Sequence, residues 1–543
     1  LHLLSRRQRQ MCIRDRDKGR SKMNKQNIYE NVRYYIGKIT VILMMVLFPF
    51  VMTDKLNNVT KTRYVFFVII ALVGWIAMLI NEVVFRIIIS GDYPGAKKSL
   101  DIKKNFNIKI IYNIKNRKHI IYSVLLIASS IISYLVSPYK NIALYGAGSR
   151  YIGMIFFIAV ALLYWTVSEC YEFKEIDVIL ILAASIMVHI VAVFNYMNID
   201  ILHLFSNLTI KEQTVYMSTL GNINVYGMYT GLTLSIAIAA YYKAETAAKE
   251  IFYYIAVISG IIGIIICDSD MALVAVVIPL VILFPYSIKS VALIKKYIVT
   301  LTAVLLAGRV AGCIKLIIPD RVRKLSNIMS GLISTNNIFN IIIIVLLLLY
   351  VLIVLSDNRL QKLLDNIKIR IVQIIYCVMA GGFGVYAIVR VISDNINKIG
   401  AFYITDSWGS GRGYIWSNLI NGYKNYPFIY KIFGLGEGTV RKNLSYYSDS
   451  HWDILYGNVV DNAHSIWLQM LVTMGCVGVI ILLVIFIHTL VNSAKHGVPD
   501  IIAGFGMAAL VYAVQGAGNI LEVITFPMFI CLLYTSDAAD DLI

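Results

Sequence analysis

The stretch DNAHSIWLQ (Asp461–Gln469) marks the point where a long polar segment gives way to a strongly apolar run. The polar segment, Ile392–Asn462, also contains SGRGYIW (Ser410–Trp416) and NYPFIYKIFGLGEG (Asn425–Gly438), and another apolar run precedes it. An Arg, a Gly-rich turn and a His at a helix mouth are thus gathered in one polar insertion. Because functional residues concentrate in loops held by a rigid scaffold, this insertion indicates a membrane protein with a chemical site in one extramembrane loop.

The composition of the chain excludes a soluble protein of this length. Hydrophobic residues make up 59% of the sequence and charged residues 15%, and the mean hydropathy is +0.73. A soluble surface needs far more charge. The apolar runs are long and continuous rather than alternating, which argues against a β-barrel. We therefore predict an all-α polytopic membrane protein with about 12–14 transmembrane helices and one long extracytoplasmic loop.

Fourteen apolar runs are candidate membrane spans. They cover residues 36–53, 64–88, 119–136, 151–168, 176–196, 225–242, 251–267, 269–286, 297–318, 338–356, 370–392, 463–491, 500–514 and 519–533. The runs 251–267 and 269–286 are separated by almost nothing, so they form either a tight hairpin or one broken, partly re-entrant element. With the amino terminus inside, Lys-rich short loops fall on one side, which the positive-inside rule assigns to the cytoplasm. The segment 319–337 is a basic exception on the outer side.

This orientation divides the chain into three native parts. Helices 1–11 cover residues 23–392, an extracytoplasmic catalytic loop covers 393–462, and helices 12–14, the last one truncated, cover 463–530. The end segments 1–22 and 531–543 resemble translations of a transposon-end sequencing adapter in its two orientations, so we expect them to be non-native. On this interpretation the natural chain begins at Met23 and its natural carboxyl end is missing.

The formal net charge of +18 is explained by the loops between spans, so we expect no nucleic-acid partner. The seven Cys are scattered along the sequence, and their spacing fits neither a metal site nor a disulfide framework. We therefore interpret them as packing residues. No phosphate-binding GxxxxGK[ST] loop is present, so the chain does not read as an ATP-driven pump.

Two loop residues are candidate catalytic groups. His464 lies where the loop becomes an apolar run, and a His there can act as a general base or a hydrogen-bond donor. The alternative is an interfacial anchor beside Trp467. Arg412 lies between two glycines, which allow close backbone approach, and its guanidinium fork matches phosphate oxygens. Its alternative is a solvated loop charge.

Four further residues are candidates for substrate binding. Arg150 follows a Gly-rich segment at the outer mouth of the fourth span. Arg309 falls inside an apolar run, where a charge must face a cavity, a partner or a bound anion, or else snorkel to the surface. Gly434 and Gly436 belong to a GxGxG pattern that reads as a turn folding the loop over a cavity.

In this order, the motifs of the chain resemble those of the O-antigen ligase and O-antigen polymerase-like family of bacterial membrane glycosyltransferases. The resemblance covers roughly residues 120–490. It rests on RYIG (150–153), TLGNINVYG (219–227), RGYIW (412–416), FGLGEG (433–438), and AH followed by LQMLVTMGCVG (463–464 and 468–478). Two features depart from the family pattern. Ser465 stands where Asn usually follows the His, and Ser269-Asp270-Met271 stands where a Ser-Arg-small segment is common.

The resemblance implies a polytopic membrane fold of GT-C-like type. It also implies transfer or polymerisation of undecaprenyl pyrophosphate-linked glycan units onto an acceptor hydroxyl at the extracytoplasmic face of the bacterial cytoplasmic membrane. The products would be O-antigen, capsule or cell-wall polysaccharide, and polymerase and ligase both stay open. Arg412 and His464 take the places of the family's loop Arg and loop-end His. Since an Asp270 carboxylate does not bind pyrophosphate as an Arg would, Arg309 or Arg150 supplies that charge, or the donor sits differently.

The expected partners are therefore a lipid-linked oligosaccharide donor, a glycan or other hydroxyl acceptor, and membrane lipid. We expect no cofactor and no metal, because the lipid pyrophosphate is itself an activated leaving group. The alternative function is a flippase or transporter of lipid-linked glycans. A transporter should show paired halves or interrupted helices in corresponding positions, and the sequence shows no such symmetry.

Overall fold

A computed structural model describes residues 26–91, 117–333, 337–366, 368–400, 402–447, 460–496 and 500–535. Within these ranges the chain is helical, with 11 helices long and apolar enough to cross a membrane. Two shorter apolar helices, Met154–Cys170 and Ile501–Gln515, add to them. With the final helix, Thr525–Thr535, each of the fourteen predicted runs overlaps a helix. The predicted fold class, an all-helical polytopic membrane protein, is confirmed.

The first half of the chain is made up almost entirely of helices in its described part. A first helix, Gln26–Phe50, ends in the π turn η1 (Leu43–Leu47) and the 3-10 turn η2 (Phe48–Phe50). It is followed by α2 (Val59–Gly91), α4 (Lys118–Val136), α5 (Lys140–Tyr145), α6 (Met154–Cys170), α7 (Glu175–Tyr196), α8 (Ile210–Val215), α9 (Ile223–Lys243), α10 (Ala247–Ile266), α11 (Val274–Ser287) and α12 (Val291–Ile317).

The second half of the chain begins with helices at the edge of the molecule and ends with helices in its body. Its elements are α13 (Asn327–Leu332), α14 (Asn337–Leu355), α15 (Asp357–Asn366), α16 (Ile369–Asn397), α17 (Trp408–Lys424), α18 (Phe428–Phe433), α19 (Val440–Tyr447), α21 (Ile466–His496), α22 (Ile501–Gln515) and α23 (Thr525–Thr535). A short antiparallel pair, β1 (Tyr216–Met217) and β2 (Gly221–Asn222), flanks the 3-10 turn η4 (Ser218–Leu220).

The helix α9 forms the centre of the molecule. Within its most apolar stretch of 18 residues, 89% is buried inside the protein. Small residues explain how its neighbours approach so closely, as is usual between membrane helices. A Cβ on Gly231 would lie 2.6 Å from Gln515 Oε1 of α22, and Gly260 of α10 faces Leu234. The helix is apolar nearly all round because protein rather than water surrounds it.

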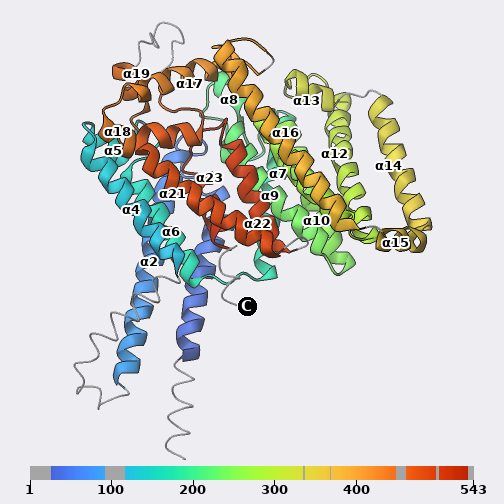
Figure 1. The fold of residues 1–543 in the computed structure, drawn as a ribbon, viewed down its shortest axis with the longest axis horizontal. Coiled ribbons are helices and arrows are strands. Elements are labelled where there is room, and N and C mark those ends of the chain that lie inside the picture. Colours follow the sequence, from blue (N-terminus) through green and yellow to red (C-terminus); the bar gives the residue numbers. More distant parts are fainter. Residues whose placement is uncertain are drawn as a thin grey trace, which may run out of the picture.

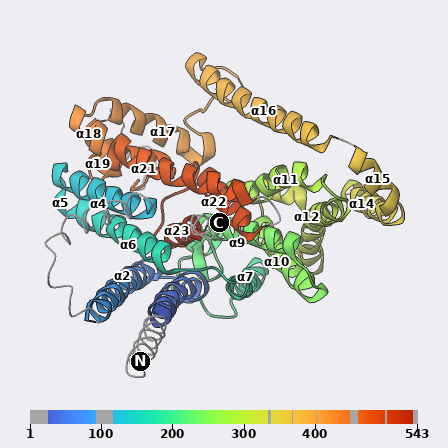
Figure 2. The ribbon, with the colours of Figure 1, turned by 60° about the horizontal axis from the view of Figure 1, so that its bottom comes forward.

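The helices α14 and α16 lie at the periphery instead. In the most apolar 18-residue stretch of each helix, only 6% of α14 and none of α16 is buried, although both stretches are strongly apolar. Figure 2 shows α16 apart from the other helices, and α14 lies at the outer edge in both views (Figures 1 and 2). Apolar side chains exposed on all sides are what a lipid-facing helix requires.

The short helices α17, α18 and α19 gather at one end of the molecule, above α21, α4 and α5 (Figure 1). Of these three helices, α17 and α19 share a small hydrophobic core with the start of α21 and the segment before it. Its buried members are Ile415, Leu419, Val440, Leu444, Ala463 and Val472. The predicted loop 393–462 is therefore largely an ordered helical cap in its described part, and it is joined to α21 through Val472.

The structure also bears on the closely spaced runs near residue 268 and on the end segments of the chain. The runs 251–267 and 269–286 form two separate helices, α10 and α11, joined through the 3-10 turn η5 (Asp270–Leu273). The adapter-like segment 1–22 lies outside the described residues, as does most of 531–543, but α23 extends through Thr535. The Lys-rich loop in 92–116, on which the predicted orientation partly depends, also lies outside the described residues.

Candidate functional site at the base of the helical cap

A left-handed turn sets the position of Arg412. Gly409, Ser410 and Gly411 all have positive φ values, of 58°, 61° and 92°, so the regular part of α17 begins at Arg412. The turn needs glycine because other residues are strained in this region. The Arg412 side chain is half-buried, and its Nε is buried with no hydrogen-bond partner among the described residues. Burial lowers the pKa of Arg412, and the carboxylate of Asp270 partly opposes this.

The segment before α21 is fixed by hydrogen bonds to its own side chains and to α17. The Asn462 side-chain oxygen accepts from the His464 amide at 3.0 Å, and Gln469 Oε1 accepts from the Ala463 amide at 3.2 Å. Trp416 of α17 donates its indole N–H to the Ala463 carbonyl at 2.9 Å. These bonds hold His464 at a positive φ of 48°, a conformation that needs such support in a non-glycine residue.

The imidazole of His464 is neutral at physiological pH. Burial, with the positive charges of Arg412 and Arg150, lowers the pKa of His464 to about 4, and Asp461 opposes this effect. Charges act strongly only over short distances in a partly buried site. Three of the predicted residues, Arg150, Arg412 and His464, therefore lie close enough in the structure for the two guanidinium charges to act on the imidazole.

Arg150 is clamped between two carboxylates. It lies in the connection between α5 and α6, and its Nε and Nη2 donate to the two oxygens of Asp461 at 3.0 and 3.3 Å. Its Nη1 donates to Glu522 Oε1, in the α22–α23 connection, at 3.4 Å. Burial works against the charged guanidinium, but Glu522 and Asp461 outweigh it and raise the pKa of Arg150. Burial also raises the pKa of Glu522 to about 7 in spite of Arg150.

Arg309 makes its contacts elsewhere. It lies on α12, where its Nη2 donates to the Leu332 carbonyl at 3.1 Å and its guanidinium lies 5.2 Å from the centre of the Phe339 ring. The described residues show no contact between it and Arg150, Arg412 or His464. Arg309 is thus held by a carbonyl and an aromatic ring. Of the two candidate cations, Arg150 is the one that lies near Arg412 and His464.

Gly434 and Gly436 form a turn that packs directly against helices. Gly434 has a φ of 78° and its Cα faces the Thr473 carbonyl, where α21 is interrupted at Gly475. The amide of Gly436 donates to the same Thr473 carbonyl at 3.0 Å. These glycines are therefore required for close packing of the cap on α21.

Two acidic residues of the site escaped the sequence analysis. Asp461 reads in sequence as a helix-capping residue, and Glu522 falls in an apolar run without any motif around it. Their roles follow from contacts between segments more than 300 residues apart in the chain, which periodicity does not reveal. One usable signal was the acidic side chain of Glu522 within an apolar run, since such residues are costly there and usually partnered.

The TLGNINVYG segment packs behind the site. Arg63 of α2 is fully buried and donates to the carbonyls of Pro49, Val51 and Thr219, at distances of 2.7, 3.1 and 2.7 Å. The Asn222 side chain caps α9 by accepting from the Asn224 amide at 2.9 Å. Asn222 therefore acts as an ordinary helix N-cap.

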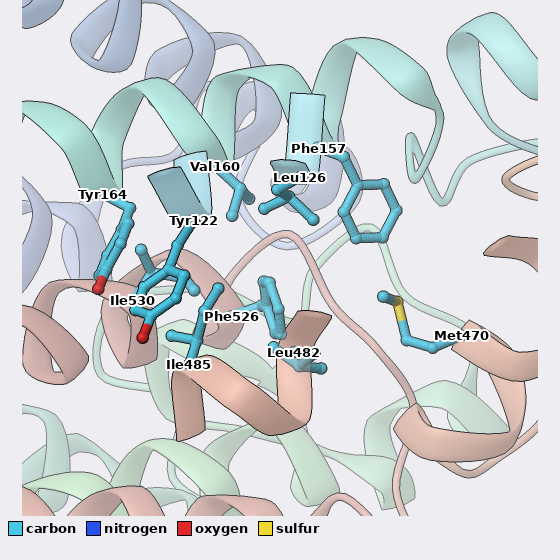
Figure 3. Close-up of a pocket in the computed structure, with 10 residues that line it drawn as sticks. All are labelled: Tyr122, Leu126, Phe157, Val160, Tyr164, Met470, Leu482, Ile485, Phe526 and Ile530. Atoms are coloured by element: carbon cyan, nitrogen blue, oxygen red, sulfur yellow. The ribbon is translucent and has the colours of Figure 1, made fainter. Parts of the chain in front are cut away.

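An apolar pocket lies below the cap, among α4, α6, α21 and α23 (Figure 3). Its lining includes Leu126, Phe157, Met470 and Phe526, with the hydroxyls of two tyrosines as the polar groups. Such a lining suits hydrocarbon but offers no group for acid–base chemistry. Among the described residues, no three His, Cys, Asp or Glu side chains form a group that could hold a metal ion.

These observations define a polytopic membrane protein with a charged site between a helical extramembrane cap and the ends of its membrane helices. Residues 328–483 match the O-Antigen ligase family model. The matched segment runs from α13 to the middle of α21 and includes Arg412 and His464. The predicted resemblance is confirmed for these residues, and the match implies a glycosyltransferase-type activity on lipid-linked glycans. No curated protein matches the chain.

Proposed function

We propose that this protein transfers or polymerises glycan units from undecaprenyl pyrophosphate onto an acceptor hydroxyl at the extracytoplasmic face of a bacterial cytoplasmic membrane. One observation carries the proposal: a half-buried Arg412, whose Nε has no partner among the described residues, lies close enough to a neutral His464 to influence its charge. Both residues belong to the segment that matches the O-Antigen ligase family. Both residues are held by the rigid cap, as a site for group transfer requires.

Arg412 is the residue best suited to the donor diphosphate. Its guanidinium is partly desolvated, so an anion that pairs with it recovers the lost solvation and forms charge-assisted bonds. In the transfer, the bond between the sugar C1 and the phosphate oxygen breaks, and negative charge develops on the leaving diphosphate. Arg412 would stabilise that charge more strongly in the transition state than in the ground state.

His464 is suited to the acceptor. A neutral imidazole has a free lone pair that can accept a hydrogen bond from the acceptor hydroxyl and take its proton as the new C1–O bond forms. Two arginines keep its basicity low in the empty site. A bound diphosphate would neutralise part of their positive charge, and the basicity of His464 would rise when the donor is in place.

Arg150 has a different part in this proposal. Because Asp461 and Glu522 already pair with it, Arg150 chiefly ties the start of α21 to the α22–α23 connection. Asp461 lies close enough to influence the charge of His464, and it would stabilise the imidazolium formed after proton transfer. The departure at Asp270 is compatible with this proposal, since its carboxylate lies near enough to Arg412 to act on the pKa of the guanidinium.

The proposal is tested with purified protein in lipid vesicles and a defined undecaprenyl pyrophosphate glycan. Arg412→Ala and His464→Ala should each lower product formation at least 100-fold, a typical effect of losing an electrostatic or acid–base group. Arg441→Ala, on the exposed face of α19, and His203→Ala, at another exposed positive-φ position, are matched controls that should retain activity. Normal product from either site variant would remove that residue from the mechanism.

A further inference from the structure

The turn Gly434–Gly438 is the place where the elements that carry the three site residues meet. On one side, the amides of Leu435 and Gly436 donate to the carbonyls of Val472 and Thr473 in α21, at 3.2 and 3.0 Å. The helix α21 follows directly after His464. The turn therefore fixes the first part of the helix that positions the imidazole.

The opposite side of the turn contacts the segment that carries Arg150. A Cβ on Gly438 would lie 2.8 Å from the Ala147 amide nitrogen, and a Cβ on Gly436 would lie 2.9 Å from Ala143. Backbones approach this closely only because glycine has no side chain. The connection between α5 and α6, and Arg150 within it, thus rests against the turn.

The start of α19, two residues after the turn, connects the turn to the helix of Arg412. Val440 is fully buried in the hydrophobic core of the cap, with Ile415 and Leu419 of α17 and with Ala463. Since α17 begins at Arg412, a displacement of the turn moves the packing surface of the Arg412 helix as well as that of the His464 segment.

One acidic side chain pins this turn to α4. Glu437 is 0% exposed, and its Oε1 accepts a hydrogen bond from the Ser130 hydroxyl at 2.6 Å. Its Oε2 is buried without a partner among the described residues. A carboxyl buried beside a single hydroxyl is stable only in its neutral form.

We propose that Glu437 is a positioning residue, whose neutral carboxyl anchors the Gly434–Gly438 turn to α4 and thereby holds Arg150, Arg412 and His464 in their relative places. This assignment rests on the proposed function for its catalytic consequence, although the docking of the turn can be measured without it.

The charged side chains around the turn do not offset the burial of Glu437. The charged side chains of the neighbouring elements at this end of the molecule include Lys140, Arg150, Arg412, Lys424, Lys431, Arg441, Lys442 and Asp461. Lys140 donates to the carbonyls of Tyr134 and Leu135, and Arg150 is paired with Asp461 and Glu522. Lys442 lies 5.3 Å from the centre of the Tyr139 ring. The charged and histidine side chains described on α4 and α21, Lys118, His119, His488 and Lys495, lie toward the opposite ends of those helices, and the other titratable groups there are Tyr122, Tyr134 and Cys476. Burial accordingly raises the pKa of Glu437 to about 8, with no nearby cation lowering it.

Hydrogen exchange at the Leu435 and Gly436 amides measures the docking directly, because both amides bond to α21. Glu437→Gln keeps a neutral group of the same shape, so exchange should stay as slow as in the wild type. Glu437→Ala and Ser130→Ala each remove the anchoring bond, and exchange corrected for intrinsic rates should rise at least tenfold. Glu245→Gln, an exposed site between α9 and α10, is the matched control. Wild-type protection in Ser130→Ala, or loss of protection in Glu437→Gln, would overturn the proposal.

A second readout separates anchoring from simple loss of structure. The wild type should lose activity and protection together as the pH rises from 7 to 9, because about one tenth of a group with a pKa near 8 stays protonated at pH 9. Glu437→Gln should retain both at pH 9. A wild type and a Glu437→Gln variant with the same pH profile would contradict the role of the carboxyl. If exchange behaves as expected but no transfer is found in any variant, the proposed function fails and the anchor stands.

Discussion

The charge state of His464 gives the sharpest prediction about the site. Its pKa is lowered from 6.5 to about 4, so neutral imidazole is favoured by about 3 kcal/mol relative to an exposed histidine. This shift makes the stability of the protein depend on pH. The imidazole takes up a proton in the unfolded chain as the pH falls below 6.5, but in the folded chain only near pH 4. The free energy of unfolding therefore falls by up to about 3 kcal/mol as the pH is lowered from 6.5 to about 4.

Diethyl pyrocarbonate reacts with neutral imidazole, and peptide mass spectrometry resolves each histidine. Modification of His464, scaled to its own plateau, should reach half its maximum near pH 4. Arg412→Gln should move that midpoint upward, because one of the two cations that lower the pKa is gone. Inorganic pyrophosphate should shift it in the same direction while leaving the exposed His203 unchanged. A midpoint near 6.5 that responds to neither change would refute the electrostatic description of the site.

Two further predictions concern the elements that support the site. Gly434→Ala places a Cβ at a φ of 78° against the Thr473 carbonyl, and it should cost more than about 2 kcal/mol, whereas Gly148→Ala, at a φ of 52° with open space around it, should cost about 1 kcal/mol. Arg63→Met leaves three buried carbonyls without their donor and should destabilise the protein by at least about 3 kcal/mol, with the exposed Lys61→Met as control. Thermal unfolding in detergent measures both pairs, and equal effects within a pair would contradict the packing described.

The sequence predicted the membrane fold well because apolar runs follow directly from the solvent in which the helices lie. Each run corresponds to a helix, including the short α6 and α22. The cap was harder to predict. Its helices are short and polar, and the regular part of α17 begins only after three residues with positive φ, Gly409, Ser410 and Gly411. The sequence around SGRGYIW does not reveal this turn.

The candidate site was predicted in part, for a physical reason. Arg412 and His464 could be selected because their residue types suit the chemistry and because they fall in the polar loop. The partners of Arg150, and the anchor at Glu437, depend on contacts between distant segments. Arg309 stands out in the sequence because it lies in an apolar run, but its neighbours in the structure are a carbonyl of α13 and an aromatic ring of α14.

Glycan transfer at the cap site requires that the bond between the glycan and the lipid diphosphate is broken. This cleavage is measured by counting the free undecaprenyl pyrophosphate released for each glycosidic bond that the purified protein forms in vesicles. We expect one lipid released per bond, release only when the acceptor is present, and no release by Arg412→Ala. Movement of intact lipid-linked glycan across the vesicle membrane, without release and unaffected by loss of His464, would contradict it and indicate a transporter.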